Sequence, residues 1–113
     1  MSTAPAQPWL AQYPKGTPAT IDTNEFRSVA DVMKVAFDRF RHRPAFVNMD
    51  KVMSYGDLDK ASLQFGCYLR NHLGLKKGDR VAIMLPNVLQ YPVALLGILR
   101  AGLTVVNTNP MYT

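Results

Sequence analysis

The sequence has one cysteine, Cys67, and lacks the short motifs that most often mark a nucleotide-binding or catalytic site. A single thiol excludes an intrachain disulfide framework and a cysteine-rich zinc site. The glycine-rich phosphate-binding patterns G-x-x-x-x-G-K-[ST] and G-x-G-x-x-G are both absent. No G-x-S-x-G elbow surrounds Ser28, Ser54 or Ser62, which excludes a hydrolase nucleophile of that kind.

The few titratable side chains with catalytic potential are explained better by structure than by chemistry. His42 and His72 each lie near the predicted end of a helix, where a cation stabilises the helix dipole. Asp57 and Asp59 are two residues apart on a predicted helix and therefore point in different directions. Nothing near Cys67 indicates an activated thiol. We therefore predict no catalytic, cofactor-binding or metal-ligating residue in this chain.

Acidic residues are scarce, since 13 Lys and Arg stand against 8 Asp and Glu, giving a net charge of +5. Much of this charge lies in two clusters, at residues 39–43 and 76–80. A nucleic-acid-binding module would interleave such clusters with exposed aromatic residues or carry a known motif. The clusters are typical of a solvated helix end and a basic turn, so nucleic-acid binding is the least favoured function.

Long uninterrupted apolar runs are also missing. The N-terminus has neither the basic start nor the apolar core of a secretory signal. The most apolar stretch, residues 81–106, is broken by polar residues and prolines, whereas a membrane-spanning helix needs about 20 nearly continuous apolar residues. We therefore expect a soluble protein in a reducing compartment, most simply the cytoplasm.

Proline is concentrated in the first part of the chain and predicts an extended arm over residues 1–27. Four prolines restrict the backbone there, namely Pro5, Pro8, Pro14 and Pro18. Trp9, Leu10 and Tyr13 are the side chains that would pin this arm to a surface, and a loose terminus is the alternative.

Residues 28–113 predict a folded unit that begins with a helix. Ser28 and Asp31 form a variant of the capping box, and apolar residues recur at helical spacing behind them. Basic residues at 41–43 suit the last turn of a helix, and Pro44 ends it.

A hairpin and a second helix follow. Residues 45–48 and 52–55 predict two short strands joined near Asp50. Ser54 and Asp57 repeat the capping signature and predict a helix that Gly74 ends. The side chains that we expect this helix to bury are Leu58, Ala61, Phe65, Tyr68, Leu69 and Leu73.

The last third predicts a strand at 80–85, a helix from about 88 to 101 and a strand at 103–107, which together form a βαβ unit. Pro92 suits only the first turn of that helix, which is apolar almost all round and should be deeply buried. A parallel strand pair needs helices on both faces and further strands at its edges. We therefore expect an α/β fold that is incomplete as it stands.

Three segments of this last third resemble a known family. The sequences GDRVAIMLPN at 78–87, YPVALLGILRAG at 91–102 and VVNTNPMYT at 105–113 are similar to the N-terminal signature of the acyl-adenylate-forming superfamily, which includes the AMP-forming acyl-CoA ligases. Upstream, PAFVN at 44–48 and MSYGDL at 53–58 resemble the family's strand pair and following helix. WLAQYP at 9–14 resembles the start of bacterial long-chain fatty-acyl-CoA ligases.

The resemblance implies that residues 28–113 are the N-terminal part of the AMP-binding large domain, truncated at the C-terminal end of the chain. It implies that the whole enzyme activates a fatty acid with Mg-ATP to acyl-AMP and transfers the acyl group to CoA. The family's phosphate loop, magnesium-binding Glu, ribose-binding Asp and catalytic Lys would all follow residue 113, so this piece is expected to be an inactive scaffold. The parent could associate peripherally with the inner membrane.

A second function remains open at this point. A free-standing βαβ interaction module would pair its exposed sheet edge and apolar helix with another chain. The isolated chain would also be expected to self-associate through such apolar surface.

Overall fold

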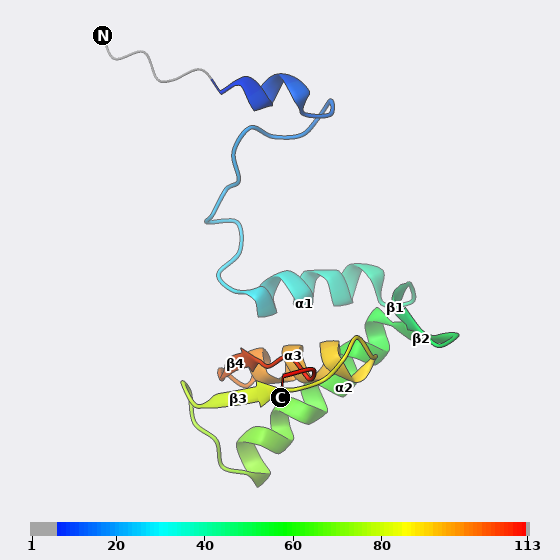
Figure 1. The fold of residues 1–113 in the computed structure, drawn as a ribbon, viewed down its shortest axis with the longest axis vertical. Coiled ribbons are helices and arrows are strands. Elements are labelled where there is room, and N and C mark those ends of the chain that lie inside the picture. The colour runs from blue at the N-terminus through cyan, green and yellow to red at the C-terminus, as the bar shows by residue number, and fades with distance from the viewer. Residues whose placement is uncertain (1–6, 113) are drawn as a thin grey trace.

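The computed structural model describes residues 7–112, in which an N-terminal arm leads into a body of helices with two small sheets (Figure 1). The elements follow in the order η1 (Pro8–Gln12), α1 (Val29–Phe40), β1 (Pro44–Asn48), β2 (Lys51–Ser54), α2 (Tyr55–Cys67), η2 (Tyr68–His72), β3 (Arg80–Ile83), α3 (Gln90–Arg100) and β4 (Thr104–Asn107). The predicted order of helix, hairpin, helix and βαβ unit is confirmed.

The arm projects away from the helices (Figure 1), and within residues 7–27 its one regular element is the short 3₁₀ helix η1. Trp9 and Tyr13 are 54% and 42% exposed, so these aromatic side chains do not pin the arm to the body. Proline in the first turn of η1 and further prolines at 14 and 18 keep the rest of the segment from continuing as a helix.

Both predicted N-caps are present. Ser28 Oγ accepts a hydrogen bond from the Asp31 N–H at 3.1 Å at the start of α1. α1 ends at Phe40 and not at residue 43, because Arg43 precedes Pro44 and is therefore disfavoured in the helical region. The Arg43 N–H instead closes a turn onto the Phe40 carbonyl at 2.7 Å and leads directly into β1.

The hairpin pairs β1 with β2 in antiparallel fashion through a two-residue turn at Met49 and Asp50. Both turn residues have positive φ, 47° and 60°, as a type I′ turn requires. The strand predicted to run to Tyr55 ends at Ser54, because Ser54 caps α2 and Tyr55 is its first residue.

α2 passes into the π-helical turn η2, and this changes which side chains are buried. Tyr68 and Leu73, predicted to lie in the core, are 47% and 51% exposed. The wider turn departs from the 100° per residue on which that prediction depends. Leu58 and Leu69 are buried as predicted, and Gly74 adopts the expected left-handed conformation, with φ of 69°.

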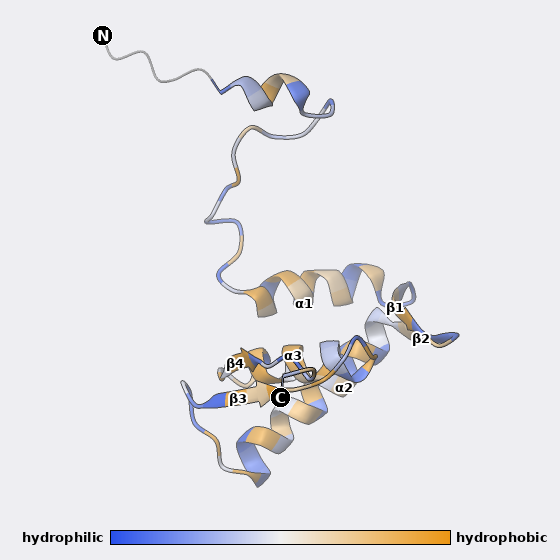
Figure 2. Ribbon diagram, in the orientation of Figure 1, coloured by the Kyte–Doolittle hydropathy of each residue, from blue (hydrophilic) through white to orange (hydrophobic). Residues whose placement is uncertain are grey.

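The βαβ unit pairs β3 with β4 in parallel, from Arg80 opposite Thr104 to Ile83 opposite Asn107. α3 connects the two strands, carries Pro92 in its first turn as predicted and is mostly apolar along its length (Figure 2). β3 is shorter than predicted, since Met84 and Leu85 lie beyond its end and are exposed.

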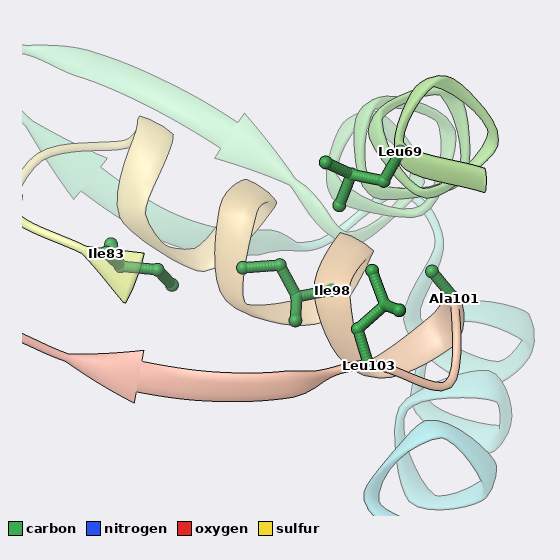
Figure 3. Close-up of a cluster of buried hydrophobic side chains, with 5 residues drawn as sticks. All are labelled: Leu69, Ile83, Ile98, Ala101 and Leu103. Carbon is green, nitrogen blue, oxygen red and sulfur yellow. The ribbon is translucent and has the colours of Figure 1, made fainter. Parts of the chain in front are cut away.

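The core consists of two clusters that meet along α3. Figure 3 shows the first, in which α3 and the residues just after it pack against η2 and β3; its members are Leu69, Ile83, Ile98, Ala101 and Leu103. The second joins α1, α2 and α3 through Phe37, Leu58 and Leu96. Other apolar side chains of α3, such as Val93 and Leu95, are only half-buried, so the expected deep burial holds for part of the helix, at Pro92 and from Leu96 to Ile98.

Candidate functional site

The strongest polar cluster lies where the end of α1, α2 and α3 meet. The Arg100 Nη1 atom donates to the Asp59 carboxylate at 2.8 Å, to the Asp59 carbonyl at 2.9 Å and to Ser62 Oγ at 2.9 Å. Arg41, just after α1, donates to the other Asp59 carboxylate oxygen at 3.2 Å. One carboxylate therefore ties together residues 41 and 100, which are far apart in the sequence.

This cluster is half-buried, and an aromatic ring supports it. Asp59 and Arg100 are each 23% exposed at the side chain, whereas Arg41 is 48% exposed. The Arg100 guanidinium lies over the Phe37 ring, 5.5 Å from its centroid. A cation over an aromatic face and a charge-assisted hydrogen bond both stabilise the guanidinium where water is partly excluded.

The sequence prediction missed this cluster. From the sequence, Arg100 is one of the polar residues that interrupt the apolar stretch at 81–106, and Arg41 is one of the basic residues in the last turn of a helix. A usable signal was the position of Asp59, one residue from Leu58, which is predicted to face the core, and three residues from Ser62. A charge there needs a partner, although the spacing along the chain does not identify which arginine supplies it.

A pocket of about 380 Å³ opens beside this cluster between the three helices. Its lining combines apolar and charged residues: Ala30, Asp31, Lys34, Phe37, Asp38, Asp59, Leu63 and Arg100. Both oxygens of the Asp59 carboxylate are already engaged by arginines, so this group is not a free general base. The arrangement is that of a structural junction between helices.

Asp57 has a different role from Asp59, as their spacing predicted. The Asp57 carboxylate accepts from the Ser54 hydroxyl at 2.6 Å and from the Ser54 backbone N–H at 3.1 Å, while Ser54 Oγ accepts from the Asp57 N–H. The side-chain and backbone hydrogen bonds from Ser54 lower the pKa of Asp57 below its usual value. This completes a capping box at the start of α2.

The two histidines and the cysteine lie apart from the Asp59 cluster. His72 stacks on Tyr68 with 5.0 Å between ring centroids, and His42 is exposed. Cys67 is a free, exposed thiol that lines a second pocket of about 280 Å³, as Arg70 does. Within residues 7–112 no three side chains of His, Cys, Asp or Glu are grouped as metal ligands.

The basic residues at 39–43 are largely engaged within the chain. Arg39 and Arg43 lie 5.2 and 5.4 Å from the centroid of the Phe40 ring, and Arg41 pairs with Asp59. Outside the two basic clusters, Arg70 donates to the Ala101 carbonyl at 2.9 Å, just after the end of α3. The arginines of the 39–43 cluster and Arg70 therefore make contacts within the chain.

The part of the chain that the structure describes, residues 7–112, contains no helix with the length and hydropathy needed to span a membrane.

Comparison with known proteins gives a consistent result. The sequence profile of a family described as AMP-binding enzyme matches residues 33–113. The long-chain-fatty-acid–CoA ligase of Salmonella typhimurium is 53% identical over 105 residues, which cover 93% of this chain and 19% of that ligase. The corresponding ligase of Escherichia coli O6:H1 is 52% identical with the same coverage.

The fold has close counterparts among solved structures. The N-terminal subdomain of Klebsiella oxytoca NpsA superposes with a TM-score of 0.73 and 24% identity, covering 78% of this chain and 23% of that one. The predicted α/β architecture is therefore confirmed as one that occurs within a larger protein. The chain spans about 19% of the length of the curated relatives that it matches.

Proposed function

Because the chain belongs to the AMP-binding enzyme family, we propose that it is part of a long-chain-fatty-acid–CoA ligase. The observation that carries this proposal is the identity of about half of all residues to ligases of that name over 93% of the chain. The alternative of a free-standing interaction module receives no support from these matches, since the named relatives are ligases along almost the whole chain.

The proposed reaction of the whole enzyme has two steps. A fatty-acid carboxylate attacks the α-phosphorus of ATP to form acyl-AMP and release pyrophosphate, and the thiol of CoA then attacks the acyl carbon and displaces AMP. Adenylation is needed because a free carboxylate is a poor electrophile. ATP, Mg²⁺ and CoA are thus the cofactor and substrates implied for the whole enzyme, with cations offsetting phosphate charge.

The residues described here do not fit the binding of these groups. Glycine-rich phosphate loops of the common types are absent from the sequence, and residues 7–112 contain no grouped metal ligands. We therefore assign no step to this chain and no catalytic, cofactor-binding or metal-binding residue. Its proposed role is scaffold: residues 28–113 form the first part of the AMP-binding domain, and residues 1–27 form an arm.

A chimera tests this function. The matched first fifth of the Salmonella typhimurium ligase is replaced by the present chain, and palmitoyl-CoA formation from palmitate, ATP and CoA is measured. We expect activity within about tenfold of the parent ligase, because about half of the exchanged residues are identical and cores tolerate exchanges that conserve volume. The present chain alone is expected to be inactive. A stable, folded chimera without ligase activity would contradict the proposal.

Two further properties accompany the proposed function. A ligase acting on long-chain fatty acids meets its substrate at membranes, which supports a cytoplasmic enzyme that associates peripherally with the inner membrane. The isolated chain carries exposed apolar residues such as Val47, Val52 and Met84, which support self-association. Sedimentation with lipid vesicles tests the first property on the chimera, and analytical ultracentrifugation over a concentration series tests the second on the chain.

A further inference from the structure

We propose that the basic surface at the start of β3 binds the negatively charged surface of a lipid membrane. Four exposed cations form this surface, which we call the basic end: Arg70, Lys76, Lys77 and Arg80. The inference rests on the proposed function, in which the enzyme meets a long-chain fatty acid at a membrane, and it names the residues that contact that membrane.

The net charge of the chain lies entirely in residues 60–113. Residues 1–59 contain seven basic and seven acidic residues, whereas residues 60–113 contain six basic residues and a single acid, Asp79. Four of these six cations belong to the basic end. The arginines at 39–43 differ from them, because they contact Phe40 and Asp59 and lie in the part of the sequence without net charge.

The fold brings two of the four cations together beside the end of α3. The Gly78 N–H donates to the Gly102 carbonyl at 3.2 Å, which holds the turn before β3 against the residues that follow α3. A Cβ atom added at Gly102 would lie 3.8 Å from Lys77 Cγ and 3.9 Å from Arg70 Nη1. Cations from η2 and from the turn therefore lie next to the same glycine, at one end of the body (Figure 1).

The other two cations flank the same turn. The Lys76 N–H donates to the Asp79 carboxylate at 2.8 Å, and the Asp79 N–H donates to the Lys76 carbonyl at 3.0 Å. Arg80 follows as the first residue of β3. The single acid of the region thus fixes the backbone of the turn, and within residues 7–112 none of the four cations forms an ion pair. With Asp79 included, the basic end keeps a net charge of +3.

An exposed apolar side chain beside these cations favours a lipid surface as the partner. Leu73 lies three residues before Lys76 and is 51% exposed. Surfaces that bind membranes combine cations, which are attracted to anionic lipids, with apolar side chains that enter the boundary between headgroups and acyl chains. A nucleic acid or a free phosphate would use the cations and leave Leu73 in water.

The position of the basic end keeps it away from the expected substrate side. Arg80 and Thr104 are the first residues of the two parallel strands and lie opposite each other in the register. Open α/β sheets bind their ligands outside the carboxyl ends of their strands, which here are Ile83 and Asn107. A membrane at the amino ends therefore does not compete with ligands at the carboxyl ends.

Flotation of the whole chain with lipid vesicles tests the proposal, because vesicle-bound protein rises in a sucrose gradient whereas self-associated protein sinks. The vesicles contain phosphatidylcholine alone or phosphatidylcholine mixed with the anionic lipid phosphatidylglycerol. We expect the chain to float with the anionic vesicles at about 0.1 M salt and to be released at about 1 M, because the Debye length falls from about 10 Å to about 3 Å. Equal flotation with uncharged vesicles would overturn the proposal.

The double substitution of Lys76→Gln and Lys77→Gln removes two charges from the basic end and keeps the aliphatic part of each side chain. Each Lys near an anionic surface strengthens binding by about fivefold, so this variant should bind the anionic vesicles about tenfold or more weakly. The matched control is Lys15→Gln with Lys51→Gln, which lowers the net charge equally at two exposed lysines elsewhere and should keep binding within about twofold. Equal losses in the two double variants would overturn the assignment to the basic end.

Folding is checked by thermal melting followed by circular dichroism. All four substituted lysines are exposed, so both double variants should melt within a few degrees of the unsubstituted chain.

Leu73→Gln distinguishes a lipid surface from other anionic partners. It should weaken binding to the anionic vesicles by about threefold or more, because it removes an apolar side chain that enters the membrane boundary. Release of the chain by inorganic phosphate at constant ionic strength would indicate a discrete phosphate site. Tighter binding to duplex DNA than to the vesicles at equal phosphate concentration would indicate a nucleic acid. Either result would overturn the proposed lipid surface.

Ligase activity of the chimera separates this inference from the proposed function. A chain that floats as expected, together with a folded but inactive chimera, would contradict the function and leave the membrane surface supported. An active chimera, together with a chain that does not float with anionic vesicles, would overturn the membrane surface and leave the function intact.

Discussion

Gly66 of α2 and Gly97 of α3 face each other where the two helices cross. A Cβ atom added at Gly66 would come within 2.9 Å of the Gly97 carbonyl oxygen, and one at Gly97 would come within 2.9 Å of the Ser62 carbonyl oxygen. Backbone oxygens do not move aside as the end of a flexible side chain does. The absence of side chains at these two positions therefore sets the distance between the helices.

Gly66→Ala should accordingly destabilise the chain by about 1–3 kcal/mol, because a methyl group has to push α2 away from α3 and disturb both core clusters. Urea unfolding followed by circular dichroism measures the change. Gln64→Ala is the matched control, since Gln64 is exposed on the same helix and alanine there removes no contact of the core. An unchanged urea midpoint for Gly66→Ala would contradict the close crossing.

The local signals in the sequence predicted much of this fold. The caps at Ser28 and Ser54 and the left-handed stop at Gly74 were predicted because each depends on residues a few positions apart. The βαβ unit was predicted because apolar runs and their breaks are also local. The glycine crossing was not predicted, since it depends on how α2 meets a helix some thirty residues later.

The same limit applies to the Asp59–Arg100 cluster. These two residues are 41 positions apart, and nothing in the spacing relates them. The proposed function could be predicted mainly from the resemblance of residues 78–113 to a known family. Such a resemblance compares whole segments and does not depend on knowing which side chains meet.

Asp59→Asn should destabilise the chain by about 2 kcal/mol, because it leaves the half-buried Arg100 guanidinium without its charged partner. A double-mutant cycle with Arg100→Met measures the coupling, and the free energy of unfolding is again obtained in urea. The exposed Lys34–Asp38 pair is the control, and its cycle should yield no more than about 0.5 kcal/mol. Equal coupling in the two cycles would contradict a structural junction at Asp59.

The capping box predicts a dependence of stability on pH. The pKa of Asp57 is lower in the folded chain than its usual value of 3.8, because Ser54 donates two hydrogen bonds to the carboxylate. The ionised carboxylate therefore stabilises the fold fully at pH values above the unfolded pKa, and this contribution is lost as pH falls through the folded pKa.

Asp57→Asn removes the titrating group and keeps an oxygen that can accept a hydrogen bond. The variant should be less stable than the unsubstituted chain at pH 7, and the difference should vanish on acidification below the folded pKa. Unfolding in urea at a series of pH values from 7 to about 2 measures this difference. A difference that stays constant over the whole range would show that the charge of Asp57 plays no part in the cap.

Met49 predicts a gain in stability. It has φ of 47° in the hairpin turn and is 88% exposed, so it combines a left-handed backbone with almost no packing. Asparagine tolerates that conformation better than methionine and is preferred at the first position of a type I′ turn. Met49→Asn should therefore stabilise the chain by about 0.5–1 kcal/mol, measured as a rise in the urea midpoint at constant slope.

Met111→Asn is the control, because Met111 is 81% exposed with a negative φ, and no gain is expected there. Equal effects at both positions would indicate that the gain comes from removing an exposed apolar side chain and not from relieving the turn.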